Sequence, residues 1–180
     1  MPNTTHTPAT VAGIEAHLTR QCLKFGPDRM EHYKTVATHE AAHIVAGLAC
    51  RAAILEVEIN PPRTTKSALG GVNVSGLLPH HDAIIWLVGW AWEEAHGNTR
   101  NADGDMRGGK GEDAENFDRN LTIARRFVLD AEPVIKACAA AVMWGVNKRG
   151  KLPTGKLHKI MDYIRPHALK HAHLIGQGHR

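Results

Sequence analysis

Two histidines four residues apart, with a glutamate directly after the first, lie in the segment VATHEAAHIVAGLAC at positions 36–50. On a helix, residues four apart point the same way, so His39 and His43 can bind one ion. Their neutral imidazoles suit Zn²⁺. Glu40, rotated by about 100° from His39, can reach a metal-bound water without binding the ion. This HExxH pattern predicts a zinc site with its own general base.

A helix that is merely rich in histidine is the alternative interpretation. The chain contains 13 histidines, so this spacing can also arise by chance. However, His39 and His43 lie within an apolar stretch and are separated by the small residues Ala41 and Ala42. Two imidazoles and an acid are costly in such a place unless they have a partner. The context therefore favours metal binding.

A catalytic zinc ion needs a third protein ligand and one open coordination position. Three regions offer candidates: the end of an apolar run, the start of a later helix, and a further histidine. Hydrophobic periodicity does not choose among these candidates, which are Glu93 and Glu94, then Asp113, Glu115 and Asp118, and then His96.

The histidine pair must be presented by a helix. Asp28 and Glu31 have the spacing of a capping box directly after a Gly-Pro break, so we expect this helix to run to about Arg51. Before it, residues 1–10 are expected to form a flexible tail and residues 10–23 a short helix.

A two-stranded hairpin is predicted next. The segment AAILEVEIN contains β-forming residues, and GGVNVSG resumes this pattern after a polar loop that begins with two prolines. We expect the hairpin to lie beside the HExxH helix. The expected fold class is therefore α+β, mostly helical, with one small β-hairpin.

Helices are expected over most of the remaining chain. Asp82 is expected to cap a helix that Gly97 ends, with Trp86 and Trp90 in the core. The polar, glycine-rich segment 98–111 is expected to be a mobile loop. Three further helices and a solvated, His-rich tail are expected to follow, over about 113–130, 133–150, 154–166 and 167–180.

The composition is that of a soluble globular protein, with 43% hydrophobic and 22% charged residues. The net charge of +4 comes without a dense Lys/Arg tract, so nucleic-acid binding is not expected. The most apolar run, AIIWLVGWAW, is too short to span a bilayer, so no membrane association is expected. The three cysteines are widely spaced, which indicates no thiolate zinc site and fits a reducing cytoplasm.

Four segments, taken in order, resemble the peptidase domain of FtsH-type zinc metalloproteases. THEAAHIVAG resembles that family's HEAGH helix, and ILEVEINPPRTTKSALGGV resembles its hairpin. LVGWAWEEAHG resembles its Gly-Gly-Arg-Ala-Ala-Glu-Glu helix, and GGKGEDAENFDRNLTIARRFV resembles its Gly-x-x-x-Asp segment with the Ile-Ala-Arg helix that follows. A fifth segment, KLPTGKLHKIM, is similar to the family's last helix.

The resemblance implies a zincin-like metallopeptidase domain over residues 26–166. An N-terminal segment, 1–25, and the His-rich tail, 167–180, would flank it. The family joins this domain to an ATPase module and a membrane anchor, and neither is recognisable in this sequence. We therefore expect a stand-alone peptidase domain.

For the site, the resemblance implies that His39, His43 and Asp113 hold zinc and that Glu40 is the base. Between Asp113 and the Ile-Ala-Arg motif this chain is about one helical turn longer than the family, so Asp118 and Glu115 stay as alternative third ligands. Asp113 also suits the N-cap of the following helix. The two glutamates of the EEAHG segment are then expected to accept a hydrogen bond from a histidine instead.

We expect hydrolysis of peptide bonds in unfolded or flexible protein segments. Glu40 would accept a proton from a zinc-activated water and pass it to the leaving amine. Leu69, Gly70, Gly71 and Val72 would hold the substrate backbone by strand addition. A zinc-bearing module that binds a peptide or partner protein without cutting it is the second hypothesis, and a hydrolase for one dedicated protein is the third. Both a homo-oligomer and a separate partner protein stay open.

Overall fold

The computed structural model describes residues 27–60, 70–97, 103–147 and 149–176. These residues form a mostly helical α+β fold with one two-stranded antiparallel sheet, so the predicted fold class is confirmed. The helix expected over residues 10–23 lies outside the described residues.

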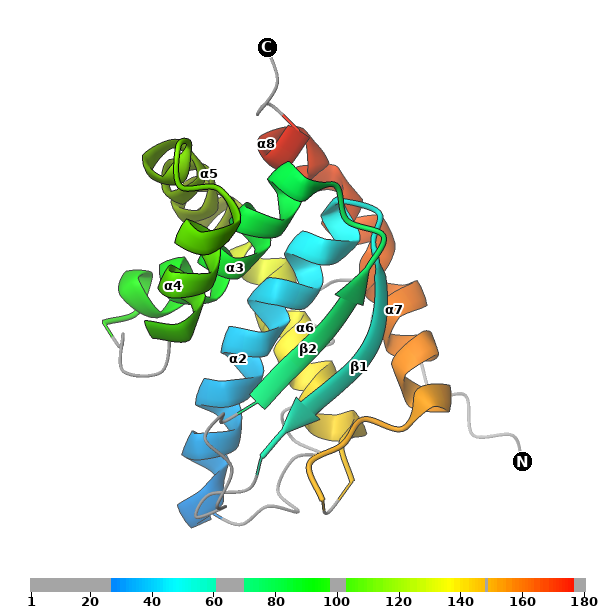
Figure 1. Ribbon diagram of the computed structural model, residues 1–180. Helices are drawn as coiled ribbons and strands as arrows, with labels where there is room; N and C mark the ends of the chain where they lie inside the picture. Colours follow the sequence, from blue (N-terminus) through cyan, green and yellow to red (C-terminus); the bar gives the residue numbers. More distant parts are fainter. Residues whose placement is uncertain (1–26, 61–69, 98–102, 148, 177–180) are drawn as a thin grey trace, which may run out of the picture.

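The HExxH helix is the centre of the fold. This helix, α2 (Pro27–Ala49), runs through the middle of the molecule, with the hairpin on one side and green helices on the other (Figure 1). Three helices pack against it: α3 (Pro79–Ala95), α6 (Glu132–Gly145) and α7 (Thr154–Ala168). A helix enclosed in this way buries apolar residues around much of its circumference, including Val36, Ala37, Ile44, Val45 and Leu48.

The predicted hairpin is present beside α2. It consists of β1 (Ala53–Ile59) and β2 (Gly70–Ser75). On its other edge, β1 exchanges backbone hydrogen bonds with the segment 150–152: Ile59 N–H donates to the Gly150 carbonyl, and Leu152 N–H donates to the Val57 carbonyl. No further strand pairs with β2 within the described ranges. The outer edge of β2 therefore has backbone groups available to an added strand.

α3 begins earlier than predicted. Pro79 occupies its first turn, where a missing N–H costs nothing, and Asp82 lies within that turn rather than at the N-cap. The C-terminal prediction is confirmed, because Gly97 follows the helix with a φ of +74°. Although α3 is strongly apolar, no helix in the described part of the chain is both long and apolar enough to cross a membrane.

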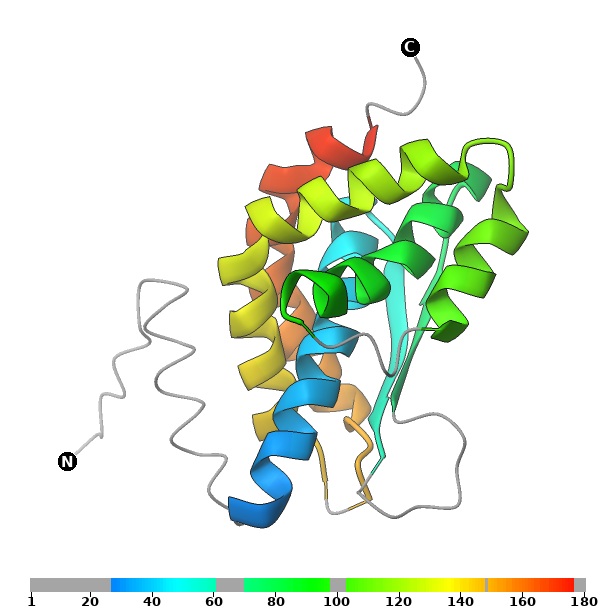
Figure 2. The same ribbon diagram turned by 90° about the vertical axis from the view of Figure 1, so that its left-hand side faces the viewer.

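A helix replaces most of the expected mobile loop. Residues 103–112 form α4 (Asp103–Glu112), which packs mainly on α3, and α5 (Phe117–Asp130) follows. In Figure 2, α4 runs along the right-hand side of the molecule, and α5 crosses its upper end. The prediction was wrong because the segment has almost no hydrophobic period, and its helix depends on tertiary contacts instead.

The C-terminal segment is also more ordered than predicted. α7 continues through Pro166, and η2 (Leu169–His171) and α8 (Ala172–Gly176) follow. Leu174 and Ile175 are buried in the core. Residues 167–176 are therefore part of the packed domain rather than a solvated tail.

Candidate metal centre

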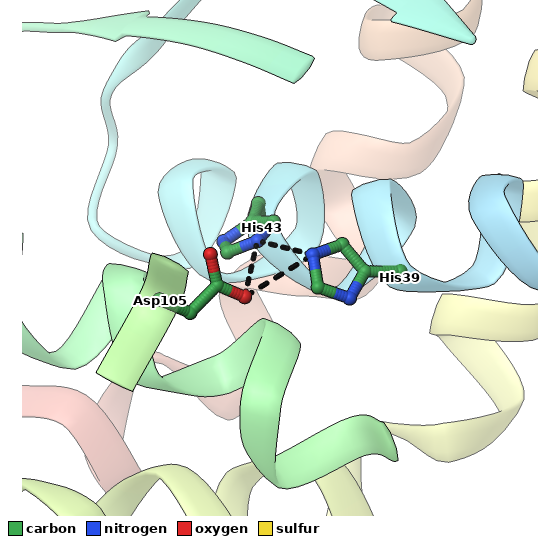
Figure 3. A group of neighbouring side chains, drawn as sticks. All are labelled: His39, His43 and Asp105. Atoms are coloured by element: carbon green, nitrogen blue, oxygen red, sulfur yellow. Dashed lines mark hydrogen bonds and ion pairs between the residues drawn. The ribbon is translucent and has the colours of Figure 1, made fainter. Parts of the chain in front are cut away.

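α2 presents the two histidines on one face. The Nε2 atoms of His39 and His43 lie 3.2 Å apart, and both rings point to the same place (Figure 3). Both residues are buried. The helical spacing of four residues, predicted to bring the two rings together, does so.

Asp105 of α4 completes a group of three. Its Oδ2 atom lies 3.1 Å from His39 Nε2 and 3.4 Å from His43 Nε2 (Figure 3). A tetrahedral ion with bonds of about 2.0–2.1 Å separates its ligand atoms by about 3.3 Å. The three donor–donor distances therefore match those of one small divalent ion. Among the described residues, this is the cluster of histidine and acidic side chains that can hold a metal.

The buried oxygen of Asp105 supports this interpretation. Oδ2 receives no hydrogen bond of acceptable geometry from the described residues, although two imidazole nitrogens lie close to it. A buried carboxylate oxygen without a hydrogen bond is costly. A cation between the three atoms would satisfy all of them.

The second nitrogen of each ring is held by a different group. His43 Nδ1 lies 2.7 Å from the backbone carbonyl oxygen of Ile85, to which it donates. His39 Nδ1 lies 3.0 Å from Oε1 of Glu93. Such contacts would hold each ring with Nε2 directed at a bound ion and would make the imidazole a stronger ligand. Of the two EEAHG glutamates, Glu93 is therefore the one that faces a histidine, at ion-pair distance, while Glu94 does not.

The site shifts the pKa values of His39 and Asp105 in opposite directions. Burial lowers the pKa of His39, but contacts with Asp105 and Glu93, and the negative charge of Glu40, outweigh it and raise the pKa to about 10. Burial raises the pKa of Asp105, and the facing histidines more than reverse this, so its pKa lies well below the usual range. Without a metal, both shifts favour a protonated His39 facing an ionised Asp105 at neutral pH.

Glu40 lies beside the cluster without joining it. Its side chain is 5% exposed, and burial raises the pKa of its carboxyl against the opposing charges of His39 and His43. A Cβ atom on Gly70 would lie 2.9 Å from Glu40 Cδ and 2.8 Å from Val36 Cγ1. Only glycine lets β2 approach the base this closely. β2 thus passes directly over the residue predicted to move protons.

Gly89 of α3 leaves space at the metal position. A Cβ atom there would meet Asp105 Oδ2 and His43 Nε2 and would lie 2.8 Å from His39 Cε1. The first two of these atoms are proposed donors, and the third is the ring carbon next to the donor nitrogen of His39. Any side chain at position 89 would therefore fill the space that an ion needs.

An open cleft of about 770 Å³ contains the cluster. Gly70, Gly71 and Val72 of β2, three of the residues predicted to hold the substrate, line one side of it, while the fourth, Leu69, lies outside the described residues. Trp86 lines the opposite side and is 41% exposed, so its assignment to the core was wrong.

Asp113 is not the third member of the group, contrary to the resemblance. It follows the end of α4, where its carboxylate accepts hydrogen bonds from Asn116 and Asn120. These bonds lower its pKa and stabilise the turn before α5. The alternatives Asp118 and Glu115 are exposed and lie outside the cluster.

The other predicted candidates also point elsewhere. Glu94 forms a two-bond ion pair with Arg125, with both N···O distances at 2.7 Å. His96 stacks on Trp92, and its Nδ1 lies 2.8 Å from the backbone oxygen of that residue. Neither side chain belongs to the three-residue group.

Sequence reasoning missed Asp105 because it lies in the segment expected to be a loop. One signal was present: Asp105, Gly108 and Gly109 have the spacing i, i+3, i+4. On a helix this puts an acid and two glycines on one face, which suits close packing against a neighbour.

Comparison of the chain with protein-family models, with curated proteins and with solved structures found no match.

Proposed function

We propose that this chain is a zinc-dependent metallopeptidase that hydrolyses peptide bonds in unfolded or flexible protein segments. The observation that carries the proposal is the convergence of His39 Nε2, His43 Nε2 and Asp105 Oδ2 at 3.1–3.4 Å from one another, with Glu40 beside them. The similarity of the HExxH and EEAHG segments to FtsH-type peptidases supports the same conclusion.

The donor set suits zinc. Two imidazoles and one carboxylate leave a coordination position open, as catalytic zinc sites require. Two histidines and a carboxylate also serve iron in some oxygenases. The glutamate directly after the first histidine distinguishes the two, because an acid next to the open position is what hydrolysis needs.

Zinc held here would lower the pKa of a water molecule and polarise a carbonyl group. Glu40 accepts a proton from the attacking water and passes it to the leaving amine. Its pKa is raised by burial, and a carboxylate with a raised pKa, here packed against Gly70, is a stronger base than an exposed one.

The outer edge of β2 is proposed to bind the substrate. Gly70, Gly71 and Val72 line the cleft, and their backbone groups would pair with an extended chain. Backbone pairing requires an extended conformation and not a particular sequence, so folded proteins would be excluded as substrates. The scissile bond would then lie between Glu40 and the three donor atoms.

The test combines metal analysis with proteolysis. Purified protein is dialysed against zinc, its metal content is measured, and it is incubated with unfolded casein. We expect about one zinc per chain and release of peptides, both abolished by a chelator. Zinc binding with no cleavage of casein would instead support the alternative, a zinc-bearing module that binds a peptide or partner protein. Absence of zinc would refute both.

A further inference from the structure

The third donor comes from a helix that buries few side chains of its own. Within α4, the buried residues are Asp105 and Gly109, and Met106 is partly buried against the core. Four of its ten residues are glycine, the least helix-favouring residue after proline. A helix this short and glycine-rich is not stable by itself.

Two glycines set how closely α4 approaches α3. A Cβ atom on Gly108 would lie 2.6 Å from Cδ2 and 2.8 Å from Cε3 of the Trp86 ring. One on Gly109 would lie 2.7 Å from Cδ2 of the buried Leu87 and 3.2 Å from the backbone oxygen of Ala83. These positions share a face with Asp105. The close contact therefore fixes how far the carboxylate reaches into the site.

The remaining two glycines behave differently. A Cβ atom on Gly104 or Gly111 would meet nothing within 4 Å. Alanine at these positions favours the helical state without obstructing the α3 contact. The same helix thus contains glycines that docking requires and glycines that it does not.

We propose that docking of α4 on α3 and metal binding form one linked equilibrium, in which Gly108 and Gly109 are positioning residues for Asp105. The inference rests on the proposed metal centre. The main buried polar group of α4 is the Asp105 carboxylate, which lies between two imidazoles. Metal bound to all three donors stabilises the docked helix, and the docked helix supplies the third donor.

Removal of the metal then leaves the Asp105 carboxylate held only by its ion pairs with the two histidines, so α4 undocks more often. Asp103, Gly104, Asp105 and Arg107 line the cleft from α4, so undocking this helix removes one wall. It also removes the helix that lies over Trp86. Metal supply would thereby control how often the cleft has its α4 wall, and not only whether the bound substrate reacts.

Hydrogen exchange tests the linkage directly. With the wild-type chain in excess zinc, we expect slow exchange for the amides of residues 103–112. In chelator, these amides should exchange at least about tenfold faster, while those in the middle of α2 and α6 should change little. Equal protection of α4 in zinc and in chelator would overturn the proposal.

Substitutions test the positioning role. Gly108→Ala and Gly109→Ala should weaken zinc binding about tenfold to a hundredfold, measured by competition with a chromophoric chelator, because each overpacks the α3 contact. The matched control is Gly111→Ala in the same helix, which should bind zinc as tightly as wild type or more tightly. Circular dichroism confirms that each variant is folded. Equal zinc affinity of Gly108→Ala and Gly111→Ala would overturn the proposal.

A compensating change adds a readout that general destabilisation does not predict. Trp86→Leu, combined with Gly108→Ala, makes room for the new methyl group and should recover part of the lost zinc affinity. None of these measurements depends on turnover. A chain that binds zinc with this pattern but cleaves no casein would refute the proposed peptidase activity and leave the α4 linkage intact. Cleavage of casein by a chain whose α4 is insensitive to zinc would refute the α4 linkage and leave the proposed peptidase activity intact.

Discussion

Glu93 Oε1 lies 3.0 Å from His39 Nδ1, while Nε2 of the same ring faces Asp105. The imidazole is thus held between two carboxylates, one on the metal side and one behind. Glu93 is 3% exposed and lies one helical turn beyond Gly89 on α3. This arrangement fixes the orientation of the His39 ring before any ion arrives.

Replacement of Glu93 should therefore weaken metal binding without removing a ligand. We expect Glu93→Gln to lower zinc affinity about tenfold to a hundredfold, as loss of such an orienting group does elsewhere. Chelator competition measures the affinity. Glu94→Gln is the matched control, because the neighbouring glutamate pairs with Arg125 at the surface. Equal loss in both variants would show that Glu93 does not act through His39.

Replacement of Glu40 should separate binding from turnover. Glu40→Gln removes the base but no ligand, so zinc stoichiometry should be unchanged while casein cleavage falls at least about a hundredfold. Glu31→Gln, an exposed position on the same helix, should retain wild-type rates. Undiminished cleavage by Glu40→Gln would exclude the proposed mechanism.

Substitution of Asp105 and of Asp113 in turn can identify the third ligand. Asp105→Ala should lose most zinc affinity, whereas Asp113→Ala should retain it and lose only the turn contacts with Asn116 and Asn120. Metal content after gel filtration distinguishes the variants. Loss of zinc in Asp113→Ala alone would support the ligand set implied by the family resemblance.

A methyl group at position 89 should exclude the metal. Gly89→Ala places Cβ against the donor atoms of all three proposed ligands or their neighbours, so zinc content should fall close to zero. Alanine favours a helix more than glycine does, so the helical signal in circular dichroism should persist. Full zinc occupancy in this variant would show that the ion lies elsewhere.

Zinc affinity should rise with pH. In the metal-free site the pKa of His39 is raised to about 10, so at neutral pH zinc must displace a proton from the imidazole. Displacement of one proton gives about a tenfold gain in affinity per pH unit, from neutral pH up to the raised pKa. Titrations between pH 6.5 and 8.5 in several buffers, about two units in all, measure both affinity and proton release. An affinity independent of pH in this range would show that zinc displaces no proton from the site, contrary to the raised pKa of His39.

The sequence determined much of this architecture. The period of apolar residues predicted α2, α3, α5, α6 and α7, and the β-forming segments predicted the hairpin, because each of these elements buries a face of its own. The HExxH spacing likewise brought His39 and His43 together, since a single helix sets their separation. Local geometry alone decides such features.

Tertiary structure decided the rest. α4 has almost no apolar face, so its helix and the reach of Asp105 depend on glycines that fit against Trp86 and Leu87 of another helix. No local pattern reveals such a fit, and the resemblance pointed to Asp113 instead. The same holds for Glu93 and Gly89, whose roles follow from which atoms of α2 and α4 they face. The histidine pair belongs to one helix, whereas the third donor exists only where two helices meet.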